Sequence, residues 1–143
     1  MIPEQTSDSR SIGTLKGTVV RGSGRGRPLG FPTANLRLDR TGQQPAAGIY
    51  ACWAQIEGDA AVYQGALHIG PRPTFSDQES TVELHILQWP DRNLYEKVIF
   101  FRPVKKLREV EKFDSIEALQ SAITQDVAQV EAVLSSLPKP GTL

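Results

Sequence analysis

The sequence predicts a mainly β protein: a six-stranded antiparallel, Greek-key-like barrel with one C-terminal amphipathic helix. Segments rich in β-branched and aromatic residues follow one another along most of the chain, and turn-forming Gly, Pro, Asp and Asn separate them. Helical periodicity does not interrupt this series, so parallel β-α-β units are not expected. Short strands with such connections favour an antiparallel barrel or sandwich. The last third of the chain changes to a helical period.

Each strand is predicted by its own segment. Strands are expected at 12–20, 48–57, 60–69, 80–89 and 94–102, with a shorter sixth strand at 103–107. These segments and the helix that follows are expected to form one domain at 12–137. A loose leader is expected at 1–11 and a tail at 138–143.

The C-terminal helix is predicted by its cap and its apolar period. Asp114 and Glu117 have the spacing of a capping box, with Asp in the capping role. Apolar residues then recur every three or four positions as far as Leu137, and Pro138 ends the pattern. We therefore expect a helix from about 115 to 137, with its apolar stripe against the outside of the barrel.

Composition narrows the classes of function. Sixteen basic and sixteen acidic residues cancel, whereas nucleic-acid-binding domains usually carry a basic excess. The single cysteine, Cys52, excludes an internal disulfide and suits a reducing compartment. The sequence has no apolar run long enough to span a bilayer and begins without a signal-peptide pattern. We expect a monomer in the cytoplasm that binds neither nucleic acid nor membrane.

A glycine-rich loop with three arginines, from Arg21 to Phe31, leads into a Pro-Thr-Ala-Asn turn that ends at Asn35. The glycines let main-chain N–H groups approach an anion, and the arginines add charge suited to phosphate. Thr33 and Asn35 carry neutral oxygens two residues apart, as a hard cation bound to phosphate requires. The segment indicates a site for a nucleotide polyphosphate with its metal. Its parts taken separately also fit a solvated hairpin loop and an ordinary turn.

The predicted strand 80–89 carries a second group of polar residues. Glu83 and His85 share one face of the strand, opposite Val82, Leu84 and Ile86. This face could simply be turned to water. It could also hold the Glu83 carboxylate on a rigid strand as a general base. The pattern of residues leaves both interpretations open.

Three motifs together resemble the riboflavin kinase (flavokinase) family. Arg25-Gly-Arg-Pro-Leu-Gly-Phe-Pro-Thr-Ala-Asn35 is similar to the family's signature, and Thr81-Val-Glu-Leu-His85 to its second motif. Asn93 to Lys97 and Leu107 to Phe113 resemble its segments near the flavin, with Glu96 at a usual glycine position. The resemblance covers residues 13 to 130. This family also supplies the C-terminal module of bifunctional bacterial FAD synthetases, and nothing in these residues corresponds to their adenylyltransferase domain.

The resemblance implies transfer of the γ-phosphoryl group of ATP to the 5′-hydroxyl of riboflavin, which gives FMN and ADP. By the same match, Glu83 is the catalytic base, and Thr33 and Asn35 hold Mg²⁺. The residues expected at the phosphates of ATP are Gly22, Gly24, Arg25, Gly26, Arg27, Gly30, Phe31 and Pro32. Those expected at the flavin are Leu94, Tyr95, Arg108 and Phe113.

Two other functions belong to different classes. One is a non-catalytic flavin- or nucleotide-binding module of the same fold, against which the presence of Thr33, Asn35 and Glu83 counts. The other is a small barrel that binds single-stranded nucleic acid through the arginine loop and aromatic residues. The zero net charge counts against that second alternative.

Overall fold

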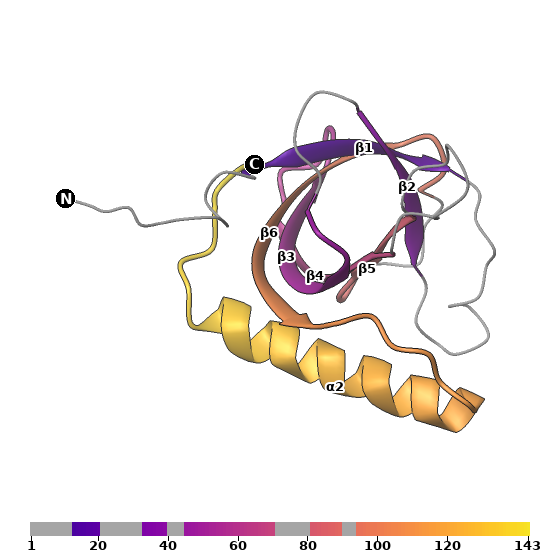
Figure 1. Ribbon diagram of the computed structural model, residues 1–143. Helices are drawn as coiled ribbons and strands as arrows, with labels where there is room; N and C mark the ends of the chain where they lie inside the picture. Colours follow the sequence, from indigo (N-terminus) through magenta and orange to yellow (C-terminus); the bar gives the residue numbers. More distant parts are fainter. Residues whose placement is uncertain (1–12, 21–32, 40–44, 71–80, 90–93) are drawn as a thin grey trace.

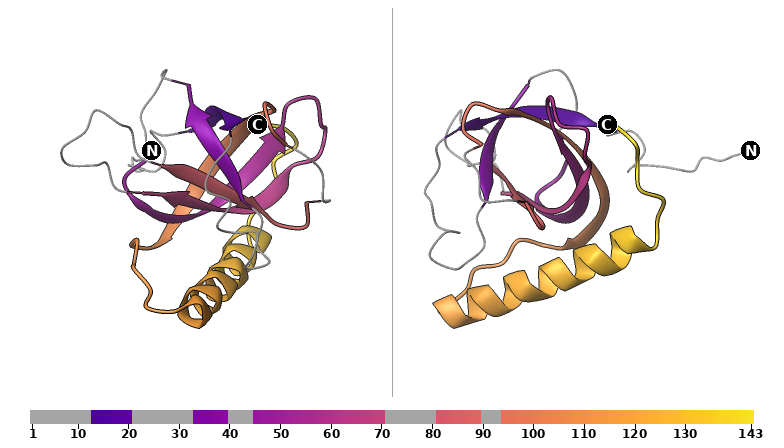
Figure 2. Two further views of the ribbon diagram at one scale, coloured as in Figure 1. Left: turned by 90° about the vertical axis from the view of Figure 1, so that its right-hand side faces the viewer. Right: turned by 180° about the vertical axis from the view of Figure 1, so that it is seen from behind.

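The structure is a computed structural model that describes residues 13–20, 33–39, 45–70, 81–89 and 94–143. They form a closed barrel of six antiparallel strands, with one helix packed across its outside (Figures 1 and 2). The predicted fold class is therefore confirmed. In chain order the elements are β1 (Leu15–Val20), β2 (Ala34–Leu38), β3 (Gly48–Ile56), β4 (Tyr63–Ile69), β5 (Val82–Ile86), β6 (Val98–Arg108) and α2 (Ile116–Ser135).

The strand order around the barrel is not the order in the chain. It runs β1-β2-β5-β4-β3-β6, and β6 closes the barrel by pairing with β1. Two steps are non-sequential, from β2 to β5 and from β3 to β6, and both pairs are antiparallel. The first of these steps concerns the candidate site. This step makes neighbours of two segments that carry separate sequence motifs.

Apart from the exact ends of the strands, the structure differs from the prediction at two places. Residues 98–108 form a single strand, β6, where two strands at 94–102 and 103–107 were predicted, and residues 94–97 precede it. Pro103 lies inside it at an irregularity of the pairing with β3, where the missing N–H of proline is tolerated. The sixth strand is instead β2, which begins within the segment predicted as a turn and continues beyond it to Leu38. Ala34 and Leu36 of β2 are buried while Arg37 is exposed, which is the alternation of a half-buried strand.

The N-cap of helix α2 lies one residue later than predicted. The Ser115 hydroxyl, not Asp114, caps the helix and accepts a hydrogen bond of 3.0 Å from the backbone N–H of Ala118. The second half of the apolar stripe packs as predicted, because Val130 and Leu134 are fully buried against the outside of the barrel. Ile116 and Leu137, at the two ends of the predicted stripe, are exposed. In the described ranges no helix is long and apolar enough to span a membrane.

The barrel interior forms the main core. Its largest fully buried side chains belong to alternating strand residues such as Leu67, Leu84, Ile99 and Phe101. Cys52 is also fully buried, and its burial raises the pKa of the thiol. This thiol is therefore a small core group rather than a reactive nucleophile.

The turn before β6 contains a residue in a strained conformation. Glu96 has a φ of +69°, and its N–H donates a 2.9 Å hydrogen bond to the carbonyl of Val19. A left-handed backbone costs a non-glycine residue about 1–2 kcal/mol. Replacing Glu96 with glycine removes this cost and loses about 0.5–1 kcal/mol of chain entropy. We expect Glu96→Gly to raise the free energy of unfolding by up to about 1 kcal/mol.

Urea denaturation of Glu96→Gly and of its neighbour Lys97→Gly measures this effect. Lys97 is exposed and has no positive φ, so glycine there should lower stability. A loss of stability in both variants would show that the conformation at Glu96 carries no strain.

Candidate active site

Five side chains from five strands form one row across the outer surface of the barrel. Direct pairing places Asn35 of β2 opposite Glu83 of β5, Glu83 opposite His68 of β4, His68 opposite Ile49 of β3, and Ile49 opposite Arg108 of β6. Direct partners in antiparallel strands point to the same face, with Cβ atoms about 4.5–5.5 Å apart. We call these five residues the outer row.

The outward direction of the row follows from the residues between its members. Leu67 immediately precedes His68 in β4, and Leu84 immediately follows Glu83 in β5. Both leucines are fully buried in the barrel interior. Because successive side chains of a strand alternate between its faces, His68 and Glu83 point outward. The candidate site is therefore on the outside of the barrel.

A cavity of about 700 Å³ lies over this surface, between the barrel and the start of α2. Its volume is in the usual range for small-molecule sites. Its lining is mixed. On the barrel it includes the polar Thr33, His68, Glu83 and His85 and the apolar Ile49, and at the helix it includes the apolar Phe113, Ile116, Leu119 and Ile123. Charged and polar residues also line the helix side, namely Glu111, Lys112, Asp114, Ser115 and Asp126. The lining therefore suits a ligand that has both polar and apolar parts.

The three residues expected at the metal and the reacting hydroxyl are brought together. Thr33 and Glu83 both line the cavity, and Asn35 is the direct neighbour of Glu83 in the outer row. Thr33 and Asn35 are two residues apart, at the start of β2. Residues of two separate motifs therefore meet because β2 pairs with β5.

Only two of the four residues expected at the flavin line the cavity. Arg108 and Phe113 line the cavity. Leu94 and Tyr95 pack against the core of the barrel, and neither is among the residues that line this cavity. The prediction that these two contact a flavin remains a prediction.

The residues expected at the phosphates lie outside the described residues; they are Gly22, Gly24, Arg25, Gly26, Arg27, Gly30, Phe31 and Pro32. The described chain on either side of them is informative. It stops after Val20 and resumes at Thr33, and Val20 pairs directly with Asn35. The described residues that flank the glycine-rich segment, Val20 and Thr33, therefore lie at the Asn35 end of the outer row.

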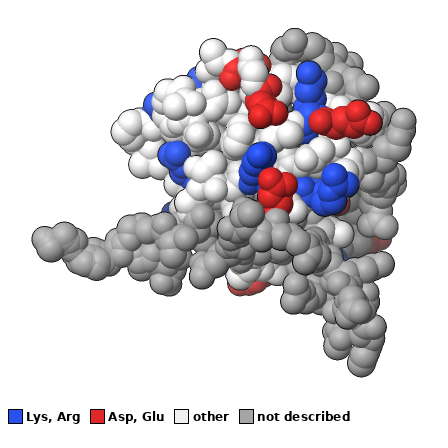
Figure 3. Space-filling model, turned by 90° about the horizontal axis from the view of Figure 1, so that it is seen from above, with Lys and Arg blue, Asp and Glu red and all other residues white. Residues whose placement is uncertain are grey.

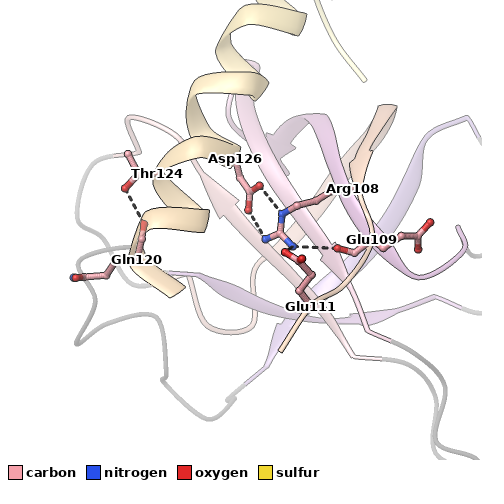
Figure 4. A network of polar contacts seen from close by, with 6 residues as sticks. All are labelled: Arg108, Glu109, Glu111, Gln120, Thr124 and Asp126. Atoms are coloured by element: carbon pink, nitrogen blue, oxygen red, sulfur yellow. Dashed lines mark hydrogen bonds and ion pairs between the residues drawn. The ribbon is translucent and has the colours of Figure 1, made fainter. Parts of the chain in front are cut away.

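An ion pair joins the end of the outer row to α2 (Figure 4). Nε and Nη2 of Arg108 each donate a 2.8 Å hydrogen bond to a different carboxylate oxygen of Asp126. The Asp126 side chain is only 8% exposed. Its hydrogen bonds raise the pKa of Arg108, against the effect of partial burial. Two parallel charge-assisted hydrogen bonds make this a geometrically specific contact between β6 and the helix.

The remaining Arg108 contacts are also within the protein. Nη1 donates a 3.0 Å hydrogen bond to the carbonyl of Glu109 and lies 3.6 Å from the Glu111 carboxylate. The guanidinium carbon is 5.7 Å from the centre of the Phe113 ring, within range of a cation–π contact. Arg108 thus holds both the helix and an apolar wall of the cavity.

Asp126 was not identified from the sequence, although a signal was present. It stands three residues after Ile123 and four before Val130, on the apolar stripe of the helix. A charged residue on such a stripe must be paired when the stripe is buried. Its partner could not be named, because Arg108 belongs to a different element.

The donor set beside Glu83 is suitable for a hard cation. Thr33, Asn35 and Glu83 offer hydroxyl, amide and carboxylate oxygens, which Mg²⁺ prefers. Across the ranges that the structure describes, no cluster of three or more His, Cys, Asp or Glu side chains could bind a metal. Mg²⁺ in enzymes is usually held by one or two protein groups together with oxygens of a bound phosphate.

The surface charge of the described residues is mixed. On the face shown in Figure 3, Lys and Arg side chains lie among Asp and Glu side chains. Lys16 and Asp39, for example, are 3.7 Å apart. The described part of this face is therefore not a continuous basic surface of the kind that follows a nucleic-acid backbone.

Comparison with known proteins gives consistent results. The family model for riboflavin kinase matches residues 11–134. The bifunctional riboflavin kinase/FMN adenylyltransferase of Bacillus subtilis is 33% identical over 128 residues, which are 87% of this chain and 40% of that protein. Mouse riboflavin kinase is 35% identical over 123 residues, which are 83% of this chain and 79% of that protein.

A solved structure is also similar. The crystal structure of riboflavin kinase from Trypanosoma brucei has a TM-score of 0.64 and 28% sequence identity to this chain. The match covers 85% of this chain and 79% of that one. The chain thus spans less than half of the bifunctional bacterial relative and corresponds to most of the length of the two proteins named riboflavin kinase.

Proposed function

Because the chain belongs to the riboflavin kinase family, we propose that it transfers the γ-phosphoryl group of ATP to the 5′-hydroxyl of riboflavin, forming FMN and ADP. One observation carries this proposal. The Glu83 carboxylate is held on a strand in the wall of a cavity of about 700 Å³, beside Asn35 and near Thr33. The same cavity offers polar side chains around Glu83 for the reacting hydroxyl, and the apolar side chains of Phe113, Ile116 and Leu119 for the flavin ring.

Glu83 is proposed as the general base. Its carboxylate accepts the proton of the 5′-hydroxyl while the oxygen of that hydroxyl forms its bond to the γ-phosphorus and the bond from phosphorus to ADP breaks. Phosphoryl transfer passes through a loose transition state, so positioning and charge neutralisation contribute more than strong basicity. A glutamate on a rigid strand meets this requirement.

Thr33 and Asn35 are proposed to hold Mg²⁺ beside the phosphates of ATP. When bound, the ion neutralises the charge on the phosphoryl oxygens. The backbone N–H groups of the glycine-rich segment, with Arg25 and Arg27, are proposed to bind the same phosphates. The pairing of Val20 with Asn35 supports this, because the segment begins and ends beside the proposed metal ligands.

The flavin ring is proposed to lie against the apolar side chains of Phe113 and the first turns of α2. Arg108 would support Phe113 there through its cation–π contact. Leu94 and Tyr95 remain a weaker proposal for the flavin site. We further expect riboflavin, FMN, ATP and ADP as the ligands of a monomeric, cytoplasmic protein.

The direct test is FMN formation. The chain is incubated with riboflavin, ATP and Mg²⁺, and the products are separated by chromatography with flavin fluorescence detection. FMN is the expected product. Binding of riboflavin and ADP without FMN would identify a non-catalytic module, and an absence of flavin binding would contradict the proposed function altogether.

Removing the proposed metal ligand Asn35 should change the metal dependence of the reaction. We expect Asn35→Ala to raise the Mg²⁺ concentration for half-maximal rate about tenfold or more, as losses around metal sites typically do. Arg37→Ala is the matched control, because Arg37 is the next outward residue of β2 and is exposed. An equal shift in both variants, or none in Asn35→Ala, would contradict the role of Asn35.

A further inference from the structure

We propose that His68 is a positioning residue whose Nε2–H donates a hydrogen bond to an inner hydroxyl of the polyol chain of the phosphoryl acceptor. This inference rests on the proposed function and adds a determinant of substrate specificity to it. Three observations support it: the position of His68 in the outer row, the hydrogen bonding of its ring, and the order of polar and apolar side chains along the row.

His68 is the direct neighbour of the proposed base. It pairs with Glu83 across β4 and β5, points to the same outer face and lines the same cavity. The Cβ atoms of such a pair are about 4.5–5.5 Å apart. A ligand whose terminal hydroxyl reaches Glu83 must therefore pass close to the His68 ring or turn away from the barrel.

The ring of His68 has an unmet hydrogen-bonding group. Its Nδ1 is buried and has no hydrogen-bond partner among the residues that the structure describes. A neutral imidazole carries one N–H, and a buried N–H without an acceptor is rarer in proteins than an unmatched acceptor. The hydrogen therefore belongs on Nε2, which makes His68 a single, directed donor at the cavity wall.

The order of residues along the outer row fits one orientation of the acceptor. The row runs from the amide of Asn35 through the carboxylate of Glu83 and the imidazole of His68 to the apolar Ile49. Neighbouring strands are about 4.8 Å apart. This spacing is close to the distance from the terminal hydroxyl of a polyol chain to the hydroxyls in its middle. The terminal hydroxyl then lies at Glu83, an inner one at His68, and the ring system beyond Ile49.

The test compares two flavins on two variants. The flavins are riboflavin and an analogue that carries an unbranched 5-hydroxypentyl chain, which keeps the terminal hydroxyl and lacks the inner ones. The variants are His68→Leu, which removes the donor, and His68→Gln, whose side-chain amide nitrogen can replace Nε2 as a donor. Affinities are measured by quenching of flavin fluorescence without ATP, and KM and kcat are measured with ATP and Mg²⁺.

We expect His68→Leu to weaken riboflavin binding about tenfold, the effect of one hydrogen bond, and to leave the affinity for the hydroxypentyl flavin nearly unchanged. The loss should appear mainly in KM. His68→Gln should recover most of the riboflavin affinity. Equal weakening of both flavins by His68→Leu, or no weakening of riboflavin, would overturn the proposal.

Gln64 provides the matched control, because it lies on the same outer face of β4 as His68 but does not line the cavity. Gln64→Leu should leave the ratio of the two affinities unchanged, and a change like that of His68→Leu would contradict a specific role for His68. The outcomes also separate the two proposals. A wild-type chain that neither binds nor phosphorylates riboflavin overturns the proposed function. If the wild-type chain is active and His68→Leu binds riboflavin with unchanged affinity, only this inference is overturned.

Discussion

Replacement of Glu83 by glutamine is expected to lower kcat for FMN formation by about 10²–10⁴-fold, the usual contribution of a general base. The amide keeps the size of the side chain and its place on β5, but it cannot accept the proton of the hydroxyl. Riboflavin affinity should change little, because the loss arises in the transition state. Steady-state kinetics and flavin fluorescence quenching measure the two effects separately.

The control for this variant is Glu57→Gln. Glu57 is exposed in the turn after β3, outside the cavity, and undergoes the same chemical change. It should retain the wild-type rate. Equal losses in the two variants would remove Glu83 from the mechanism, and a loss confined to KM would make Glu83 a binding residue instead.

Replacement of Asp126 by alanine is expected to lower the free energy of unfolding more than any other single substitution proposed above. The change leaves Arg108, whose side chain is 24% exposed, without its bidentate partner. Breaking a buried ion pair from one side costs about 3–5 kcal/mol, and the partial exposure of Arg108 reduces this to about 2–3 kcal/mol. The midpoint of urea or thermal unfolding measures the effect.

The same variant should weaken flavin binding, because the ion pair holds α2 over the cavity. Glu131→Ala, on the exposed side of the same helix, should change the free energy of unfolding by less than about 0.5 kcal/mol. The double variant Arg108→Met/Asp126→Leu should recover much of the lost stability, because it leaves no unpaired charge. If Asp126→Ala were as stable as the Glu131→Ala control, the ion pair between Arg108 and Asp126 would not hold the helix.

The fold class could be predicted because each element shows its own period. The alternation in β4 and β5 and the three- and four-residue steps of α2 are local properties, so the sequence was sufficient for them. Boundaries were less certain. The division at Pro103 was wrong because a bulge tolerates a proline within a strand, and β2 was missed because its five residues follow a turn-like Pro-Thr motif.

The site was predictable in part. Thr33, Asn35 and Glu83 were selected from the sequence by motifs that resemble a family, and the pairing of β2 with β5 brings them together. Asp126 and His68 were not selected, because a charged residue on a helix and a histidine on a strand have no local pattern that names their partners. Asp126 matters because it pairs with Arg108, and His68 because it lies opposite Glu83; both partners are distant in the chain.

The sequence by itself was sufficient to predict the barrel with its helix, and motifs that resemble a family selected Thr33, Asn35 and Glu83 as candidate site residues. Only the tertiary structure decided which of those residues face one another. The physical reason is the closure of the sheet. In a closed barrel each strand must pair on both sides, so the register between distant segments, and not the order of residues within them, aligns Asn35, Glu83 and His68 on one outer surface.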